Sequence, residues 1–190
     1  MVARAEAEGA LGGIAAGKVG VWWFLASEIM VFGGLITSYI VFRLGGPGWA
    51  EASHHLSMPL AVTNTFVLLT SSFTVVQAFV AAERGDPRAL RRHLGLTILG
   101  GLIFLGIKAV EYTTEIRAGF TPGAGIFWSF YYTMTGLHAL HVLGGIVVNG
   151  VVLATEGVGV KHPHRVELAG LYWHFVDVVW IFLFPLLYLV

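Results

Sequence analysis

The longest uncharged stretch of the chain lies at residues 118–155 and reads AGFTPGAGIFWSFYYTMTGLHALHVLGGIVVNGVVLAT. A helix rises about 1.5 Å per residue, so about 20 apolar residues cross the roughly 30 Å hydrocarbon core of a bilayer. Because Pro122 and Gly123 interrupt the beginning of the stretch, we expect the helix itself at residues 125–155. An uncharged segment of this length predicts an integral membrane protein.

Four similar segments flank this one. We expect further helices at residues 19–42, 58–82, 92–115 and 168–190. Charges within these segments are few, as expected where each unpaired charge costs several kcal/mol, and the short connections contain Gly and Pro. The sequence therefore predicts an all-α membrane protein. Its five transmembrane helices form one bundle within residues 18–190, preceded by a mobile tail at residues 1–17.

The composition agrees with this interpretation and excludes several kinds of function. Only 12% of the 190 residues are charged, about half the share in soluble domains. Eleven Lys and Arg residues balance eleven Asp and Glu residues, so there is no basic excess to bind the phosphates of a nucleic acid. The chain has no cysteine, which excludes disulfides, thiolate nucleophiles, zinc–thiolate sites and iron–sulfur clusters.

The distribution of Lys and Arg predicts the orientation of the bundle, because positive loops stay in the cytoplasm. With a cytoplasmic N-terminus, two basic residues face outward, Arg43 and Arg117. The other loop and tail positions then face inward: Arg4, Lys18, Arg84, Arg88, Arg91, Arg92, Lys161 and Arg165. We therefore expect a cytoplasmic N-terminus and, after five helices, a periplasmic C-terminus.

Two of the expected helices carry acidic residues that need a partner. An ionised Glu28 in hydrocarbon would require a counter-charge, so we expect a protonated carboxyl group. It is either a proton-responsive or lipid-facing site, or a hydrogen-bonded packing residue between helices. Lys108, Glu111 and Glu115 share one face of the third helix. An ion pair between Lys108 and Glu111 would neutralise both charges, and a transport role is the alternative.

Histidines and acids also mark the last two helices. Residues at helical spacing along the fourth are Tyr131, Thr135, His138, Val142, Gly145 and Asn149, with His141 close to the same face. The fifth aligns Glu167, His174 and Asp177. Three histidines could bind copper or haem, but histidines inside membranes mostly bond to neighbouring helices. We expect His174 and Asp177 to bond to each other or to another helix, and we expect no metal site.

Aromatic residues near the helix ends are candidates for anchors at the membrane surface. They are Trp22, Trp23, Tyr172, Trp173 and Tyr188. Trp180 is deep enough in the last helix to pack inside the bundle.

Residues 172–180, YWHFVDVVW, strongly resemble the signature of subunit III of the haem–copper terminal oxidases. Four shorter motifs follow the order of that family. They are FLASEIM at residues 24–30, Asn64-Thr65 with Ser71-Ser72, Glu111-Tyr112, and TGLHALHV at residues 135–142. The resemblance covers residues 20–190 and is to the five-helix bacterial form, which lacks two N-terminal helices of larger members.

The resemblance implies a non-catalytic accessory subunit of a proton-pumping aerobic terminal oxidase, which reduces O2 with electrons from cytochrome c. No residue of the chain is then catalytic and none binds a metal, because the haems and copper sit in partner subunits. The chain would pack mainly against subunit I, in a complex with subunit II and a small subunit IV. It would bind structural phospholipids, support proton uptake, and reside in the bacterial plasma membrane as a multi-pass protein.

The resemblance also suggests roles for individual residues. Glu28 matches the buried, carbodiimide-reactive glutamate of the family. Positions that match lipid-binding or packing residues are His138, His141, Glu167 and Trp173. Those expected in structural polar contacts are Lys108, Glu111, His174 and Asp177. Lys108 stands where mitochondrial relatives have Gln, so the pairing near Glu111 differs from theirs.

Three alternatives stay open at this stage. A quinol oxidase subunit III differs only in the electron donor, which this subunit does not touch. An accessory protein of nitric oxide reductase shares the same motifs. A free-standing membrane cytochrome, using His138, His141 and His174 as ligands, would belong to another class altogether.

Overall fold

The computed structural model describes residues 2–155, 160 and 162–189 of the chain, and these residues contain helices and no strand. The elements in order are α1 (Val2–Leu44), α2 (Trp49–Ser53), α3 (Met58–Glu83), α4 (Pro87–Arg117), α5 (Ile126–Ala154) and α7 (Pro163–Tyr188). All but the short α2 contain a segment long and apolar enough to cross a membrane, which in α1 is Gly17–Leu44. The five-helix membrane fold is therefore confirmed.

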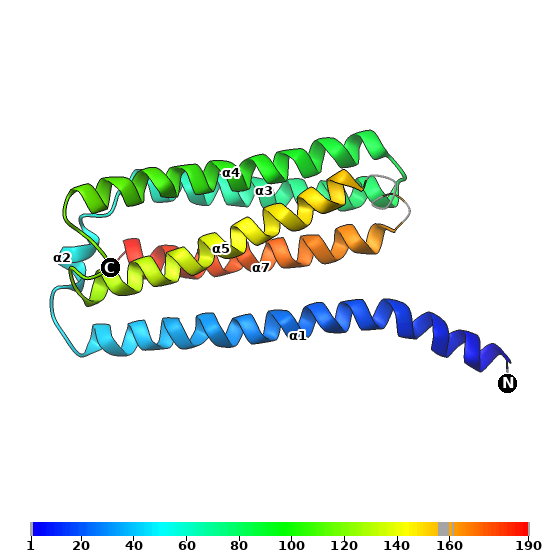
Figure 1. Cartoon of the computed structure of the whole chain (residues 1–190), viewed down its shortest axis with the longest axis horizontal. Helices are drawn as coiled ribbons and strands as arrows, with labels where there is room; N and C mark the ends of the chain where they lie inside the picture. Colours follow the sequence, from blue (N-terminus) through cyan, green and yellow to red (C-terminus); the bar gives the residue numbers. More distant parts are fainter. Residues whose placement is uncertain (1, 156–159, 161, 190) are drawn as a thin grey trace.

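The long helices lie side by side in one bundle (Figure 1). α3 and α4 pack against each other on one side, α1 lies on the opposite side, and α5 and α7 lie between them. α1 contacts the bundle through α7 and α5. The C-terminus lies near α2, at the end of the bundle opposite to the N-terminus (Figure 1).

Two helices begin five residues earlier than the sequence predicted. α4 begins at Pro87 rather than residue 92, and α7 begins at Pro163 rather than residue 168. Proline suits the first turn of a helix because its missing N–H is not needed there. The Asp86 side chain also accepts hydrogen bonds from the backbone N–H groups of Arg88 and Ala89 and so caps α4. The expected starts were wrong because both helices extend beyond the apolar segment that sequence hydropathy detects.

α1 also begins before the expected residue 19, since its first residue is Val2. Six alanines at residues 3–16 favour a helix there. The membrane-crossing part begins at Gly17. The mobility expected of residues 1–17 stays a prediction.

Aromatic side chains and glycines set the close packing of the bundle. A Cβ atom at Gly145 of α5 would lie 2.6 Å from Cε3 of Trp173, and one at Gly101 of α4 would lie 2.7 Å from its Cη2. Trp173 thus fills the space that these two glycines leave. Trp180 is also buried, as predicted, but the expected surface position of Trp173 and Tyr188 is wrong because both lie inside the bundle. The α5 residues that recur at helical spacing, from Tyr131 through His138 to Asn149, are all buried.

Candidate functional site

Glu28 lies in the middle of α1 and faces α5. Its Oε2 atom is 3.1 Å from Nε2 of His141, and the two side chains are 18% and 13% exposed. The other ring nitrogen of His141, Nδ1, lies 2.8 Å from the carbonyl oxygen of Leu137. Phe32 of α1 packs edge-on against the imidazole. The pair is thus a polar contact that ties α1 to the bundle.

These contacts define how many protons the pair holds. A carbonyl oxygen only accepts hydrogen bonds, so Nδ1 of His141 carries a hydrogen. Nε2 can then bond to the Glu28 carboxyl group only if one further proton lies between them, on either the carboxyl or the imidazole. In both arrangements the net charge of the pair is zero. This suits a site in hydrocarbon, where an uncompensated charge is costly.

An apolar groove of about 400 Å³ lies close to this pair, between α1, α5 and α7. Phe24, one turn from Glu28 on α1, lines it together with Tyr172 of α7. The Tyr172 hydroxyl donates a hydrogen bond to the carbonyl oxygen of His141 at 3.1 Å, so the groove and the pair share a wall. Arg165 lines the groove two turns before Tyr172 on α7. The groove therefore combines an apolar lining with a cationic side chain towards one end.

Glu167 lies near this end of the groove and bonds to α1. Its Oε1 atom is 2.8 Å from Nζ of Lys18, and both side chains are partly exposed. Such exposed pairs contribute little to stability, about 0–1 kcal/mol. The Lys18–Glu167 pair nevertheless links the beginning of α7 to α1.

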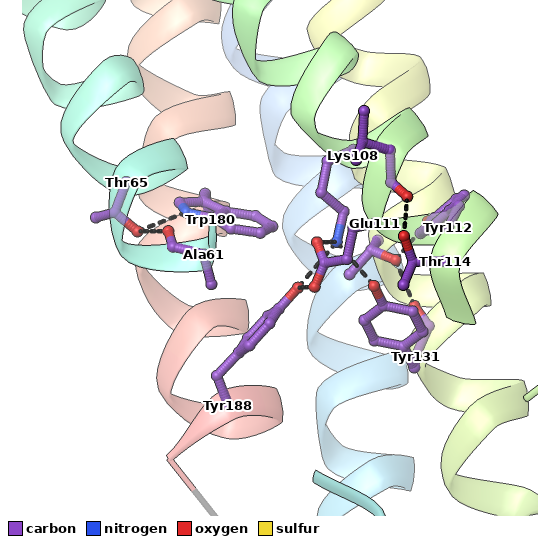
Figure 2. Close-up of polar contacts among 11 residues, drawn as sticks. Ala61, Thr65, Lys108, Glu111, Tyr112, Thr114, Tyr131, Trp180 and Tyr188 are labelled. Atoms are coloured by element: carbon purple, nitrogen blue, oxygen red, sulfur yellow. Dashed lines mark hydrogen bonds and ion pairs between the residues drawn. The ribbon is translucent and has the colours of Figure 1, made fainter. Parts of the chain in front are cut away.

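Lys108 and Glu111 form a buried ion pair on α4 (Figure 2). Nζ of Lys108 lies 2.8 Å from Oε2 of Glu111, and the side chains are 3% and 1% exposed. Nζ also donates hydrogen bonds to the hydroxyls of Tyr131 on α5, at 3.1 Å, and Tyr188 on α7, at 2.9 Å. Figure 2 shows these side chains converging from three helices. Glu115, one turn further along α4, is buried as well.

We call Lys108, Glu111, Tyr131 and Tyr188 the Lys108 cluster, and the charged atoms in it are all hydrogen-bonded. The three ammonium hydrogens each have an acceptor. The Tyr188 hydroxyl in turn donates to Oε1 of Glu111 at 2.7 Å, so both carboxylate oxygens have a donor. Four aromatic rings lie 4.8–5.6 Å from Nζ and add cation–π attraction. A buried ion pair is tolerated when its remaining hydrogen-bonding groups are satisfied in this way.

Two residues in the middle of α7, His174 and Trp173, bond to serines of α3. Nδ1 of His174 lies 2.7 Å from Oγ of Ser72. The indole of Trp173 donates to Oγ of Ser71 at 3.1 Å. Asp177 is buried one turn beyond His174, and no hydrogen bond joins these two within the described chain. These contacts hold the central part of α7 against α3.

The three histidines considered as metal ligands have separate surroundings. His138 is completely buried, edge-on to Phe104 and stacked on Trp180. His141 and His174 bond to α1 and α3 instead. Among the side chains that the structure describes, no three His, Cys, Asp or Glu residues are placed to hold a metal ion.

Residues 10–190 match the family model described as cytochrome c oxidase subunit III. The chain belongs to this family. The match includes all five membrane-crossing segments, so the resemblance seen in residues 172–180 extends over the whole bundle.

Curated relatives of this subunit III chain agree with the family. The cytochrome c oxidase subunit 3 of Corynebacterium diphtheriae is 41% identical over 91% of this chain and 87% of the relative. That of Thermostichus vulcanus is 35% identical over 90% and 86%. A Staphylococcus haemolyticus protein described as quinol oxidase subunit 3 is 32% identical over 91% and 88%. The chain is therefore an oxidase subunit III, of the cytochrome c or quinol type.

The sequence did not predict several side chains that contact the site residues of this subunit III chain. Tyr188 was expected at the membrane surface. No sequence feature near Tyr188 predicts that its hydroxyl accepts a hydrogen bond from Lys108. Tyr131 does belong to the α5 residues that recur at helical spacing, but this spacing does not identify Lys108 as its partner. Lys18 and Ser72 come from helices far along the chain from Glu167 and His174, and sequence spacing does not report such contacts.

Proposed function

We propose that this chain is the accessory subunit III of a proton-pumping cytochrome c oxidase that reduces O2, with haem and copper held by partner subunits and no catalytic residue of its own. It stabilises the catalytic subunit, binds structural phospholipid and supports proton uptake. The observation that carries the lipid and proton roles is the hydrogen-bonded Glu28–His141 pair, which lies next to an apolar groove and is linked to it through Tyr172.

The groove between α1, α5 and α7 supports the lipid role. Its lining is apolar apart from Arg165 and the Tyr172 hydroxyl, and the latter already bonds to the backbone of His141. An acyl chain suits such a lining, and a guanidinium near one end suits a phosphate group. His141, Glu167 and Glu28 contribute by holding the three walls together, whereas His138 and Trp173 pack the core behind them.

The same pair supports the proton role. A proton placed between a carboxyl and an imidazole can reside on either group without a change in net charge. A carboxyl inside a membrane segment is a functional candidate by default. We assign to Glu28 the proton-holding role and to His141 the role of its partner. The charged groups of the Lys108 cluster are fully hydrogen-bonded, which favours a structural role for Lys108 and Glu111.

The proposed setting is a bacterial plasma membrane, with the N-terminus in the cytoplasm and the C-terminus in the periplasm. Subunit I is the main partner, and subunit II and a small subunit IV belong to the same complex. A quinol oxidase is the second candidate, favoured by the relative from Staphylococcus haemolyticus. The 41% identical relative favours cytochrome c as the electron donor.

The test is purification of the tagged chain from its native membranes in mild detergent, for the wild type and for Glu28→Gln. Glu51→Gln is the matched control, because Glu51 lies on α2 with an exposed side chain. Each preparation is examined by gel, visible spectrum and O2 consumption with reduced cytochrome c or a quinol, recorded over many turnovers.

We expect the wild-type chain to bring down a haem-containing subunit with O2-reducing activity, while the chain expressed alone is colourless. Glu28→Gln should assemble normally but lose activity sooner during sustained turnover, and Glu51→Gln should match the wild type. A chain that purifies alone with its own haem or copper contradicts the accessory role. If the wild type, Glu28→Gln and Glu51→Gln lose O2-reducing activity at the same rate during turnover, the proposed role of Glu28 is contradicted.

A further inference from the structure

A second apolar groove is lined by residues of α3 and α4. These two helices lie on the side of the bundle away from α1 (Figure 1). Its volume is about 360 Å³. Phe66, Val67 and Thr70 line it from α3, and Leu96, Leu99 and Ile103 line it from α4. It shares no lining residue with the groove beside Glu28.

Small residues along the floor explain why a groove forms here. A Cβ atom at Gly100 would lie 2.7 Å from Cβ of Ser71, so the two backbones approach closely at this level. The hydroxyls of Thr74 and Thr97 lie 2.7 Å apart one turn further along. Larger side chains stand on either side of this contact, with Phe66 66% and Leu99 51% exposed. The close contact of the two helices therefore closes the bottom of the groove, and apolar side chains form its two sides.

The polar groups of the groove are already used within the protein. Thr70 donates its hydroxyl hydrogen bond to the Phe66 carbonyl oxygen at 2.8 Å, and Thr63 donates to that of Pro59. Transmembrane helices associate through small residues and interhelical hydrogen bonds. In this groove, the small residues pack at the α3–α4 contact, and the hydroxyls bond either across that contact or within their own helix. What remains for an occupant is hydrocarbon surface, which suits an acyl chain better than another helix.

One end of the groove is cationic. Arg92, Leu96, Leu99 and Ile103 follow each other at helical spacing on α4, and all four are exposed. Arg88 lies one turn before Arg92 and is exposed too. Among the described residues, neither guanidinium has a hydrogen bond or an ion pair to another side chain. Two free guanidinium groups thus continue the line of the groove towards the α3–α4 turn.

The depth of these arginines matches a lipid headgroup. Thr97 lies opposite Thr74 at the near end of the groove, and Arg92 comes five residues earlier, about 7.5 Å along the axis. The 31 residues of α4 span about 46 Å, whereas the hydrocarbon core is about 30 Å thick. A helix of this length centred in the bilayer would extend about 8 Å beyond the core at each end. The first turns of α4, with Arg88 and Arg92, lie in that region.

The length of the groove matches one leaflet. From Thr63 to Thr74 it follows twelve residues of α3, whose eleven helical steps cover about 16 Å, and half of the hydrocarbon core is about 15 Å. We propose that this groove binds one acyl chain of an anionic phospholipid, whose phosphate is held by Arg88 and Arg92. Guanidinium groups pair with phosphate through two parallel hydrogen bonds, and basic residues between helices at the membrane surface select anionic headgroups.

The test uses the intact oxidase complex, delipidated and then reconstituted in nanodiscs of phosphatidylcholine with a titrated share of phosphatidylglycerol. Retained lipid is counted by native mass spectrometry for the wild type, for Arg88→Gln/Arg92→Gln and for Leu99→Trp, which fills the groove. Arg117→Gln is the matched control, because it removes a charge from the other end of the same helix. A photoreactive benzoylphenylalanine at position 103 reports what touches the groove.

We expect the double variant to bind phosphatidylglycerol roughly 25-fold more weakly, at about fivefold per arginine. Leu99→Trp should retain one lipid fewer, whether phosphatidylglycerol or phosphatidylcholine. Arg117→Gln should bind phosphatidylglycerol as the wild type does. Crosslinking at position 103 should add the mass of a phospholipid. Unchanged retention in the double variant, or a crosslink to another polypeptide, would overturn the proposal. The groove beside Glu28 is untouched by these variants, so failure here leaves the proposed accessory role intact.

Discussion

Glu28 and His141 are 113 positions apart in the chain, yet their side chains lie 3.1 Å apart across the contact between α1 and α5. α1 packs on the bundle only along one side, so this contact matters for its position. Because Nδ1 of His141 donates to a carbonyl oxygen, Nε2 can accept a hydrogen bond as a neutral imidazole. The consequence is that a neutral donor can replace the Glu28 carboxyl group.

Glu28→Gln should therefore preserve the position of α1, since the Gln amide N–H can donate to Nε2 of His141. Glu28→Ala removes the donor and leaves the ring nitrogen unsatisfied, at a cost of about 1–3 kcal/mol. The measurement is the thermal unfolding of the purified complex, together with the amount of this subunit it retains. If the Gln variant is as unstable as the Ala variant, the pair is an ion pair rather than a neutral one.

Lys108→Met should destabilise the bundle by about 3–5 kcal/mol, because it leaves the buried Glu111 charge without its partner. The double variant Lys108→Met/Glu111→Gln should recover much of this loss, since no charge remains and the Gln oxygen can still accept from Tyr188. Circular dichroism during heating gives both unfolding midpoints. A double variant as unstable as the single one would show that the ion pair itself is required.

Tyr188→Phe removes a hydroxyl that bonds to both charged groups of the Lys108 cluster. Hydrogen bonds to charged groups contribute about 1.5–3 kcal/mol, so a clear fall in the unfolding temperature is expected. Tyr39→Phe is the control, because its buried hydroxyl donates to the neutral carbonyl oxygen of Leu186, a bond worth about 0.5–1.5 kcal/mol. Equal losses in the two variants would contradict the special role of Tyr188.

Gly145→Ala should destabilise the fold because its Cβ would lie 2.6 Å from the Trp173 ring, which is already fixed between α4 and α5. Overpacking of this kind costs about 1–3 kcal/mol. Gly150→Ala lies on the same helix, and no atom would come within 4 Å of its Cβ. It should be neutral or slightly stabilising, since Ala favours helices. The unfolding temperatures of the two variants test this. A lower unfolding temperature for Gly150→Ala than for Gly145→Ala would contradict the close packing of Gly145 against Trp173.

Val148→Trp should fill the groove beside Glu28, which Val148 lines. We expect loss of a bound phospholipid and earlier inactivation of the oxidase during turnover, measured by lipid mass spectrometry and O2 consumption. Val147→Trp is the matched control. Val147 is the neighbouring residue, is exposed, and does not line the groove. If the two variants behave alike, the groove does not hold the lipid that supports turnover.

Local residue patterns predicted the membrane fold well. The number of helices follows from the length of apolar segments, because a bilayer imposes the same minimum on every crossing helix. The buried α5 face that includes His138 follows from helical periodicity. The Lys108–Glu111 pair was also foreseeable, since residues three apart on a helix are neighbours. The starts of α4 and α7 were missed because a first-turn proline in each helix, and the Asp86 cap in α4, rather than hydropathy, decide where those helices begin.

The sequence by itself therefore determined the helices and the faces they bury, because both depend on neighbouring residues and on the hydrocarbon around them. Only the tertiary structure decided which polar groups meet. Glu28 with His141, Lys18 with Glu167, and Tyr188 with Glu111 are 113, 149 and 77 positions apart. It also placed Trp173 and Tyr188 inside the bundle, because an aromatic side chain with a polar group suits either a membrane surface or a core that offers it a hydrogen bond.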